Sequence, residues 1–546
     1  MDQIQTINGV LLARMVRAGA ANLRAHVQTI NDLNVFPIPD GDTGDNMLMT
    51  SIGGVDRIGA DIGSVSEMSR RISDGMLLSA RGNSGVILSQ IFEGIADGLE
   101  GIDEADGEAL VKALRRGTEH AYQAVMEPTE GTMLTVMRCA TQYAAEKAAP
   151  SPEGLLRDFL VEAKRTLEKT PEMLSVLKKA GVVDSGGAGL IYIAEGMLNA
   201  FSDTEEAETL TPAASAAQEI DLSRFTEDSV LEYGYCTELL LRLQRCKTDI
   251  EAFEVGMLTD YLKGIGDSVV TFKTGSIVKI HIHTMTPDRV LAFCQRYGEF
   301  LKVKIENMSL QHNNITQNDS NPSAGPKSER KPYGIVAVAS GDGIKALFTE
   351  CGADVIVDGG QSMNPSAEDF LEAFAQVNAE TILVLPNNGN IILAARQAAG
   401  MYADADVRVI DSRTIGDGYA ALSMFSADSG DTEQIVSELT EAMDGVITAE
   451  VSKSVRDAEG VHAGEYIGFV GKNILASGSS RFETVCRTAE KTDFSAHDIC
   501  LLLRGREVDR AEAEALRDKL LAQYPGKELY LIDGMQEIYD YILILE

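Results

Sequence analysis

The sequence predicts a multidomain protein that combines an all-helical part with an α+β part and an α/β part. Residues 1–202 carry apolar side chains at helical spacing, starting with Ile7 and Leu11, and this periodicity predicts amphipathic helices. Residues 227–310 alternate strand and helix patterns in the order β-α-β-β-α-β, whereas residues 333–546 repeat apolar strands followed by helical stretches. These two orders are typical of a ferredoxin-like sheet and of an α/β sheet, respectively.

The expected elements follow from these periodicities along the chain. In the first part the helical spacing recurs at residues 107–126 and 155–180. In the third part we expect strands at 334–339 and 381–385 and a helix at 367–377. The middle part carries the fullest pattern, with strands at 231–243, 268–273, 276–284 and 301–306 and helices at 249–263 and 287–297.

Two linkers separate the three parts. Residues 203–226 combine acidic and small residues, and residues 311–332 are rich in Pro, Ser and Asn. Neither segment has a periodicity strong enough to require a core. A chain of 546 residues has room for about three domains of ordinary size. We therefore expect domains at 1–202, 227–310 and 333–546.

Composition limits the classes of partner. The formal net charge is −35, which argues against a protein that binds nucleic acid or anionic membranes in general. The seven cysteines include no C-x-x-C pair, and their spread over a long chain suits a reducing compartment. The first residues lack a basic segment followed by an apolar core, and no apolar run approaches bilayer length. We expect a cytoplasmic protein without a transmembrane segment.

The turn D-G-D-T-G at residues 40–44 presents two carboxylates just before an expected helix. Mg²⁺ usually takes one or two protein carboxylates plus phosphate oxygens and keeps its other waters, so this turn can hold the ion against a phosphate. An acidic surface turn is the alternative, because Asp and Gly favour turns in any context. An EF-hand is excluded, because Asp45 stands where that loop requires Gly.

Three further turns rich in small residues precede expected helices. They are A-R-G-N-S-G at residues 80–85, E-G-T-M-L-T at 130–135 and D-S-G-G-A-G at 184–189. Helix N-terminal amides can receive phosphate oxygens at such turns, and Arg81 could add positive charge. Each turn alone is more often a helix cap than a ligand site. The sequence lacks the P-loop motif and the catalytic-loop motifs of protein kinases.

His281 and His283 occupy alternate positions of an expected strand, so they project to one face together with Lys279. Cys236, near the start of the same expected sheet, could add a thiolate, and one Cys with two His is a ligand set associated with Zn²⁺. The two histidines can equally be hydrogen-bonded or face solvent. His312 has weaker support as a ligand.

The joint order of the four turns resembles the nucleotide-binding domain of bacterial dihydroxyacetone kinases. The similarity continues through Y-C-T-E at 235–238, V-K-I-H-I-H-T at 278–284, E-N-M at 306–308, G-G-Q-S-M-N-P-S at 359–366 and L-P-N-N at 385–388. The full series resembles the ATP-binding subunit of the bacterial fatty acid kinase, and residues 333–546 resemble the DegV-type fold of fatty-acid-binding proteins. Within that last part we expect Asn364, Pro365 and Ser366 to form an ordinary β-turn rather than a lipid head-group loop.

The resemblance implies an ATP and Mg²⁺ site in the helical part. Asp40 and Asp42 would be the principal Mg²⁺ ligands, Asn34 is a further candidate, and Arg81 would act beside them in catalysis. The nucleotide pocket would include Thr43, Asn46, Ser84, Gly85, Thr132, Met133, Asp184 and Gly187. In the middle part the resemblance implies Zn²⁺ held by Cys236, His281 and His283. It also implies a homodimer.

The implied function is ATP-dependent phosphorylation of a fatty acid carboxylate, which gives an acyl phosphate and ADP. A separate DegV-type carrier protein would present the fatty acid. No long apolar groove can be recognised beside the four turns, as expected for an acceptor that arrives on another protein. Two alternatives stay open: a kinase of dihydroxyacetone or another small hydroxy compound, and a non-catalytic scaffold that senses nucleotides.

Overall fold

The chain divides into two compact units, one of residues 1–210 and 330–546 and one of residues 211–329. The first unit therefore joins the two ends of the sequence, and the second unit is the middle part. The computed structural model describes residues 4–34, 41–59, 63–147, 151–202, 235–245, 247–248, 250, 253, 255–274, 277–307, 330–360, 364–427, 431–457 and 460–546.

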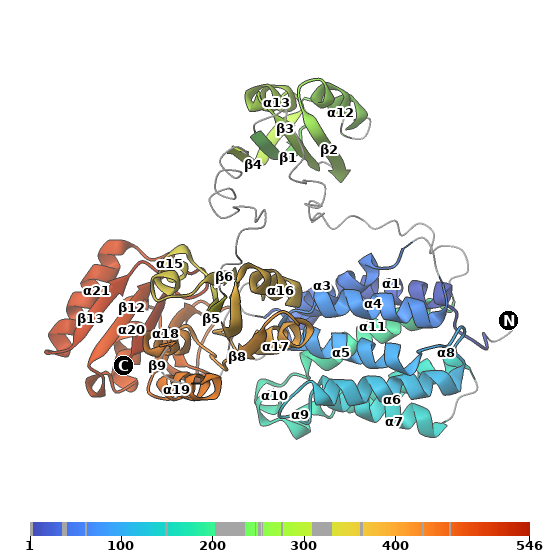
Figure 1. Cartoon of the computed structure of the whole chain (residues 1–546), viewed down its shortest axis with the longest axis horizontal. Helices are drawn as coiled ribbons and strands as arrows, with labels where there is room; N and C mark the ends of the chain where they lie inside the picture. The colour runs from blue at the N-terminus through green and yellow to red at the C-terminus, as the bar shows by residue number, and fades with distance from the viewer. Residues whose placement is uncertain are drawn as a thin grey trace. The chain divides into compact units, whose positions relative to one another are not determined.

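The amino-terminal part of the first unit is a helical assembly, drawn in blue to cyan in Figure 1. None of the described helices of the chain is both long enough and apolar enough to cross a bilayer. The helices of this part are α1 (Gly9–Ala25), α2 (Val27–Asn31), α3 (Thr43–Asp56), α4 (Val65–Leu78), α5 (Gly82–Gly98), α6 (Gly107–Gln123), α7 (Met133–Lys147), α8 (Pro152–Leu167), α9 (Thr170–Met173), α10 (Ser175–Ala180) and α11 (Ser185–Asn199).

Close packing of these helices depends on glycine at their contact points. A Cβ at Gly196 of α11 would lie 2.4 Å from the backbone oxygen of Ala18 in α1. A Cβ at Gly94 of α5 would lie 2.3 Å from the backbone oxygen of Arg116 in α6. Both separations are far below van der Waals contact, so only glycine lets these helix pairs approach. The prediction of an all-helical first part is confirmed.

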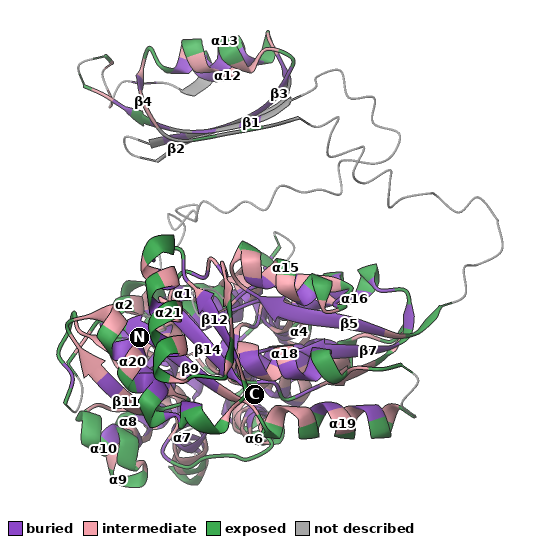
Figure 2. Cartoon of the chain, turned by 90° about the vertical axis from the view of Figure 1, so that its left-hand side faces the viewer, coloured by how far each residue is buried: buried purple, intermediate pink, exposed green. Residues whose placement is uncertain are grey.

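The second unit is a four-stranded antiparallel sheet in the order β2-β3-β1-β4. Figure 2 shows its two helices on one face of the sheet. Residues 231–234 of the first expected strand lie outside the described residues. The sheet order and the chain order β-α-β-β-α-β confirm the ferredoxin-like prediction. The elements are β1 (Tyr235–Leu243), α12 (Val255–Lys263), β2 (Asp267–Thr274), β3 (Ile277–Thr284), α13 (Pro287–Cys294) and β4 (Gly298–Asn307).

The carboxy-terminal part of the first unit starts with a parallel four-stranded sheet in the order β6-β5-β7-β8. One face packs on α16 and α17 through apolar residues such as Phe370 and Phe374. The other face packs on α15, α18 and α19. These elements are β5 (Lys331–Ala339), α15 (Asp342–Glu350), β6 (Val355–Asp358), α16 (Ala367–Gln376), β7 (Ala379–Leu385), α17 (Ile392–Met401), β8 (Asp406–Val409), α18 (Ile415–Met424) and α19 (Thr432–Asp444).

A mixed six-stranded sheet completes this part, in the order β11-β10-β9-β14-β12-β13. Figure 2 shows β5, β7, β12 and β14 as largely buried strands. The α/β prediction for the third part is confirmed. The elements are β9 (Ile447–Lys453), β10 (Tyr466–Val470), β11 (Asn473–Gly478), α20 (Arg481–Lys491), the 3₁₀ helix η3 (Phe494–Ala496), β12 (Ile499–Arg504), α21 (Arg510–Gln523), β13 (Glu528–Ile532) and β14 (Tyr541–Leu545).

The helical part and the parallel sheet share a core within the first unit. Ala80 and Val86, at the start of α5, belong to the same apolar cluster as Phe370 of α16, and Figure 1 shows α16 and α17 beside α3 and α5. Gln397 of α17 adds a hydrogen bond from its Nε2 to the backbone oxygen of Leu77 at 2.6 Å. The two ends of the sequence therefore meet at the turn that precedes α5.

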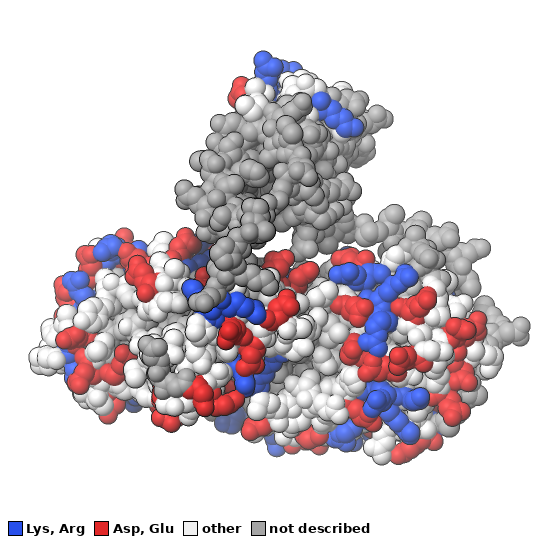
Figure 3. Space-filling view, viewed as in Figure 1, with Lys and Arg blue, Asp and Glu red and all other residues white. Residues whose placement is uncertain are grey.

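The surface carries the acidic excess as a mixture of charges. Figure 3 shows Asp and Glu side chains interspersed with Lys and Arg over the described residues of the face in view. Several exposed pairs form ion pairs along a helix, such as Arg157 with Glu153. Exposed pairs of this kind contribute little individually to stability. The negative net charge is therefore a property of the general surface.

Candidate functional site

Asp42 stands at the N-cap position of α3, yet its side chain makes no capping hydrogen bond. Asp is among the residues that cap helices best, so another group serves this helix. Asn31 Oδ1 accepts from the Gly44 amide at 2.7 Å, and Asn31 Nδ2 donates to Asp45 Oδ2 at 2.7 Å. The Asp42 carboxylate is thereby left available to bind something other than its own helix.

The Asp42 carboxylate lies half-buried between two asparagines. Asn364 Nδ2 donates to Asp42 Oδ2 at 2.5 Å, and Asn46, one turn along α3, donates a second hydrogen bond. Burial raises the pKa of Asp42 to about 6 in spite of these hydrogen bonds, because a carboxylate away from water loses its hydration. A cation bound at this position would stabilise the ionised form.

Helix α5 begins at a left-handed glycine packed against α3. Gly82 has a φ of +56°, and a Cβ there would lie 2.5 Å from Asn46 Nδ2. A Cβ at Gly85 would lie 2.4 Å from Thr50 Oγ1 of α3. Glycine is required at both positions because the starts of two helices approach each other closely. Ser84 lies between them in the first turn of α5.

Asp184 caps α11 and ties this helix to α7. Its Oδ2 accepts from the Gly187 amide at 2.7 Å, and the carboxylate also accepts from the Met133 amide. One carboxylate therefore joins the first turns of two helices. Burial raises the pKa of Asp184 to about 6, although both backbone hydrogen bonds favour its ionised form.

A cluster of hydroxyl and amide groups joins α3 to α11. Thr43 Oγ1 donates to Asn34 Oδ1 at 2.9 Å, and Ser185 Oγ donates to the same oxygen at 3.2 Å. The Ser185 and Thr43 hydroxyl oxygens lie 3.3 Å apart. Because Asp42 precedes Thr43 and Asp184 precedes Ser185, the two carboxylates of raised pKa belong to neighbouring points of the backbone. Asn34 as a Mg²⁺ ligand stays a prediction, and it would require these hydroxyls to turn away.

Helices α3, α5, α7 and α11 therefore begin close together. Each helix N-terminus leaves backbone amides unpaired and carries a partial positive charge, so four such ends form a site suited to phosphate groups. Asp40 lies outside the described residues, and its role as a Mg²⁺ ligand stays a prediction. The predicted nucleotide-binding residues all lie in or just before these first turns: Thr43, Asn46, Ser84, Gly85, Thr132, Met133, Asp184 and Gly187.

Arg81, at the N-cap of α5, contacts the carboxy-terminal part. Its Nη1 donates to the backbone oxygen of Asn364 at 3.1 Å, and its Nη2 lies 3.9 Å from Asp369 Oδ2. The prediction of an ordinary β-turn at residues 364–366 is wrong. Ser366 instead pairs with Arg81 in a β-bridge and caps α16, because its side chain and that of Asp369 form a capping box.

Sequence reasoning missed three residues of this site: Asn31, Ser185 and Asn364. The first two lie beside or within the motifs, so a polar side chain next to a helix start was an available signal. Asn364 lies 322 positions from its partner Asp42. Nothing local to either sequence segment indicates that pairing, which depends on how the two ends of the chain pack.

The predicted zinc ligands belong to adjacent strands of the second unit. The register of β1 and β3 places Cys236 opposite His283 and Glu238 opposite His281. The side chains of these residues lie outside what the structure describes. Within the described residues, no group of three or more His, Cys, Asp and Glu side chains is arranged to hold a metal. The zinc site stays a prediction.

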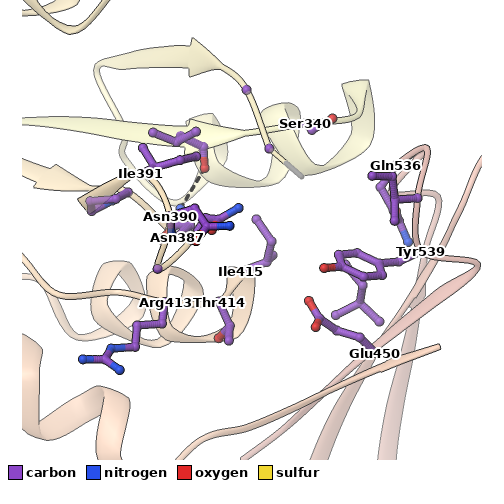
Figure 4. Close-up of a pocket in the computed structure, with 18 of the residues that line it drawn as sticks. Ser340, Asn387, Asn390, Ile391, Arg413, Thr414, Ile415, Glu450, Gln536 and Tyr539 are labelled. Atoms are coloured by element: carbon purple, nitrogen blue, oxygen red, sulfur yellow. Dashed lines mark hydrogen bonds between the residues drawn. The ribbon is translucent and has the colours of Figure 1, made fainter. Parts of the chain in front are cut away.

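A cavity of about 600 Å³ lies in the carboxy-terminal part. Figure 4 shows Asn387 and Ile415 on one side of it and Glu450 and Tyr539 on the other. Loops that follow β5 and β7 line the cavity, and the carboxyl ends of parallel strands are the usual binding edge of such sheets. Asn83 of α5 also lines it, with Nδ2 3.3 Å from Asn390 Oδ1. The cavity therefore adjoins the second of the four helix starts.

Three family models match the chain in consecutive segments. The model described as DAK2 domain matches residues 37–199. The models of the FakA-like middle domain and the FakA-like C-terminal domain, both of fatty acid kinase, match residues 232–315 and 334–546. The three segments occur in the order that the sequence resemblance predicts.

Known proteins match over the full length. Protein YloV of Bacillus subtilis (strain 168) is 36% identical over 555 residues, with 100% of this chain and 100% of that protein covered. Protein SAR1202 of Staphylococcus aureus (strain MRSA252) is 35% identical over 553 residues, with the same coverage of 100% and 100%. A solved structure of the Streptococcus pneumoniae fatty acid kinase (Fak) B3 protein loaded with linoleic acid matches at 13% identity and a TM-score of 0.31. It covers 39% of this chain and 99% of that chain.

We expect Asp184→Asn to keep the helix cap, because Asn caps as well as Asp, and to remove the pH dependence that this carboxyl contributes. The fold raises the pKa of Asp184 from 3.8 to about 6, so the folded protein binds this proton more tightly than the unfolded chain. The resulting stabilisation is complete below the unfolded pKa and is lost as the pH rises through about 6. From about pH 7.5 to about pH 5, the thermal midpoint of the metal-free wild type should therefore rise relative to that of Asp184→Asn.

Asp184→Ala is the matched control, because it removes both the charge and the cap. It should be less stable than Asp184→Asn by about 1 kcal/mol at either pH. The same pH dependence in wild type and Asp184→Asn would contradict the raised pKa.

We expect the purified protein to carry about one zinc ion per chain, as sites with one Cys and two His do. Elemental analysis of the wild type and of the double variant Cys236→Ser, His281→Ala should show loss of zinc in the variant. Cys294→Ser should keep the metal, because Cys294 is a buried core residue of the same unit. A metal-free wild type with full activity would exclude a zinc role.

Proposed function

Because the chain belongs to the FakA-like family of fatty acid kinases, we propose that it transfers the γ-phosphoryl group of ATP to the carboxylate of a fatty acid. The products would be an acyl phosphate and ADP. A separate fatty-acid-binding protein would present the acceptor. Family membership supports a kinase in general, and the acceptor and the catalytic role of this chain are the proposal.

The observation that carries the proposal is the meeting of four helix starts at a carboxylate that caps no helix. Asp42 is held by Asn46 and Asn364 while Asn31 serves α3 in its place. The amides of the first turns favour phosphate oxygens, and a free carboxylate beside them favours a hydrated divalent cation. A Mg²⁺ complex of ATP requires both kinds of group together.

The donors present fit Mg²⁺, because this ion prefers oxygen ligands and few protein carboxylates. Asp42 would hold it, and Asp40 and Asn34 are the further candidates. When bound, Mg²⁺ would neutralise charge on the phosphate oxygens. Amides in the first turns of α5 and α11 would bind the same phosphates, and Arg81 at the start of α5 would add positive charge.

The acceptor needs no general base, since a fatty carboxylate is already ionised at neutral pH. The obstacle is the repulsion between that carboxylate and the phosphates of ATP. Positive charge from the helix ends and Arg81 reduces the repulsion, and alignment of the reactants lowers the remaining barrier. A carboxylate oxygen then forms the bond to the γ-phosphorus while the bond to the bridging oxygen breaks, and ADP leaves with that electron pair.

A carrier protein explains how a lipid reaches a polar site. Burial of an acyl chain is favourable by about 0.8 kcal/mol per CH₂, so a long fatty acid does not remain free in water at an exposed site. A protein that buries the tail and exposes the carboxylate delivers the nucleophile without releasing the lipid. It also fixes the direction of attack.

The cavity of the carboxy-terminal part favours one second candidate, a kinase that binds a small acceptor itself. A volume of about 600 Å³ lies in the range of small-molecule sites. Asn83 joins the cavity wall to α5. The lining includes Arg413 and Glu450 beside apolar side chains, which suits a compact hydroxy compound better than a long acyl chain.

Trapping of acyl phosphate with hydroxylamine tests the proposal. We expect wild type with Mg²⁺, ATP and fatty acid to give hydroxamate only when the carrier protein is present. Asp42→Asn should lower the yield by about 100-fold or more, with an unchanged circular dichroism spectrum, because Asn fills the same volume. Asp103→Asn, which alters an exposed carboxylate of the same helical part, should leave the yield unchanged.

Each other outcome selects a different function. Efficient hydroxamate formation from free fatty acid and this chain alone would contradict the two-protein proposal. Phosphorylation of a small hydroxy compound, which gives an ester stable to hydroxylamine, would select the second candidate. Nucleotide binding without transfer to any acceptor would leave a nucleotide-sensing scaffold.

A further inference from the structure

The carboxy-terminal part reaches the helical site through one short segment, residues 364–367. The Ala367 amide donates to the backbone oxygen of Ala80 at 3.2 Å, and Ser366 pairs with Arg81. These contacts attach the segment to the turn just before α5. Asn364 is the residue of this segment that continues to the Asp42 carboxylate.

Asn364 is built into the site. Its side chain is 2% exposed, its Nδ2 donates to Asp42 Oδ2 at 2.5 Å, and the same nitrogen lies 3.4 Å from Asn46 Oδ1. Its backbone oxygen accepts from Arg81 Nη1 at 3.1 Å. A Cβ at Gly82 would lie 3.1 Å from Asn364 Nδ2, so the glycine of the second motif also leaves room for this amide.

The other atom of the same amide has no protein partner. Asn364 Oδ1 is buried, and no described residue donates a hydrogen bond to it. Arg81 Nε, in the residue bonded to the Asn364 backbone, is likewise buried without an acceptor among the described residues. Unpaired buried polar atoms are costly. Two of them beside a desolvated carboxylate point to a polar ligand, and Mg²⁺ usually keeps several waters that can occupy such positions.

We propose that Asn364 is a positioning residue for Asp42, and that the carboxy-terminal part thereby completes the cation and phosphate site of the helical part. The inference rests on the proposed function. Asn364 Nδ2 fixes the carboxylate that would hold the cation, and Asn364 Oδ1 accepts from a water molecule of the hydrated cation. Partners of metal-binding carboxylates commonly set metal affinity in this way.

The arrangement couples domain contact to ligand binding. If seating of residues 364–367 strengthens cation binding at Asp42, the bound cation must strengthen that seating by the same factor. Asn364 would then report on the state of the catalytic site to the carboxy-terminal part. A contact that served only to join the two parts would show no such preference for the Asp42 neighbourhood.

Mn²⁺ binding measured by electron paramagnetic resonance on the full chain, with and without ADP, tests the inference. Asn364→Ala removes the amide, and Asn364→Leu removes its hydrogen bonds while keeping most of its volume. Both should weaken Mn²⁺ binding in the presence of ADP by about 10- to 100-fold. Thermal unfolding without metal checks that each variant folds.

Gln397→Ala is the matched control, because Gln397 bonds Leu77, Ser89 and Gln90 across the same boundary and touches none of the four helix starts. It should change Mn²⁺ affinity less than about 2-fold, even if it lowers the thermal midpoint as much as Asn364→Ala does. Equal effects of Gln397→Ala and Asn364→Ala on Mn²⁺ affinity, or unchanged affinity in both Asn364 variants, would overturn the inference and leave the proposed function standing. A wild type that binds neither Mn²⁺ nor ADP would overturn both.

Discussion

The structure of the site depends on one constraint: Asp42 does not cap the helix that it precedes. Asn31 accepts the Gly44 amide in its place, which frees the carboxylate to lie between Asn46 and Asn364. Burial without a counter-charge makes the ionised form costly. The same position is surrounded by helix N-termini that attract anions. A metal-bound phosphate satisfies both requirements, and this links the strained electrostatics of the free site to its proposed function.

The glycines of the motifs act through packing. Gly82 and Gly85 let the start of α5 approach α3, and a Cβ at Gly189 would lie 2.5 Å from Met47 Sδ of α3. Side-chain hydrogen bonds then fix the helix ends, with Asp184 joining α11 to α7. Backbone amides are brought together because the helices pack without side chains between them. Helix packing and phosphate recognition therefore place the same demand on these positions.

Much of this architecture could be predicted from local sequence patterns. Helical periodicity around Ile7 and Leu11, and the β-α-β-β-α-β order of the middle part, gave the correct fold classes because they reflect which face each element buries. The motif residues near the four helix starts were predicted for the same reason, since capping and glycine turns are local. Asn364 was misjudged as part of a turn, because its partner Asp42 lies at the other end of the chain. Its role follows only from the packing of α16 against α5, which no local pattern encodes.

The central claim is that the four helix starts and Asp42 form one site for a metal–nucleotide complex. A crystal structure of the full chain with Mn²⁺ and a non-hydrolysable ATP analogue tests it most directly, because anomalous scattering locates Mn²⁺ independently of the protein density. The account predicts Mn²⁺ beside the Asp42 carboxylate and phosphate oxygens at the amides that begin α3, α5 and α11. Mn²⁺ and nucleotide bound elsewhere, for example in the cavity beside Asn387, with Asp42 still held only by its two asparagines, would contradict it.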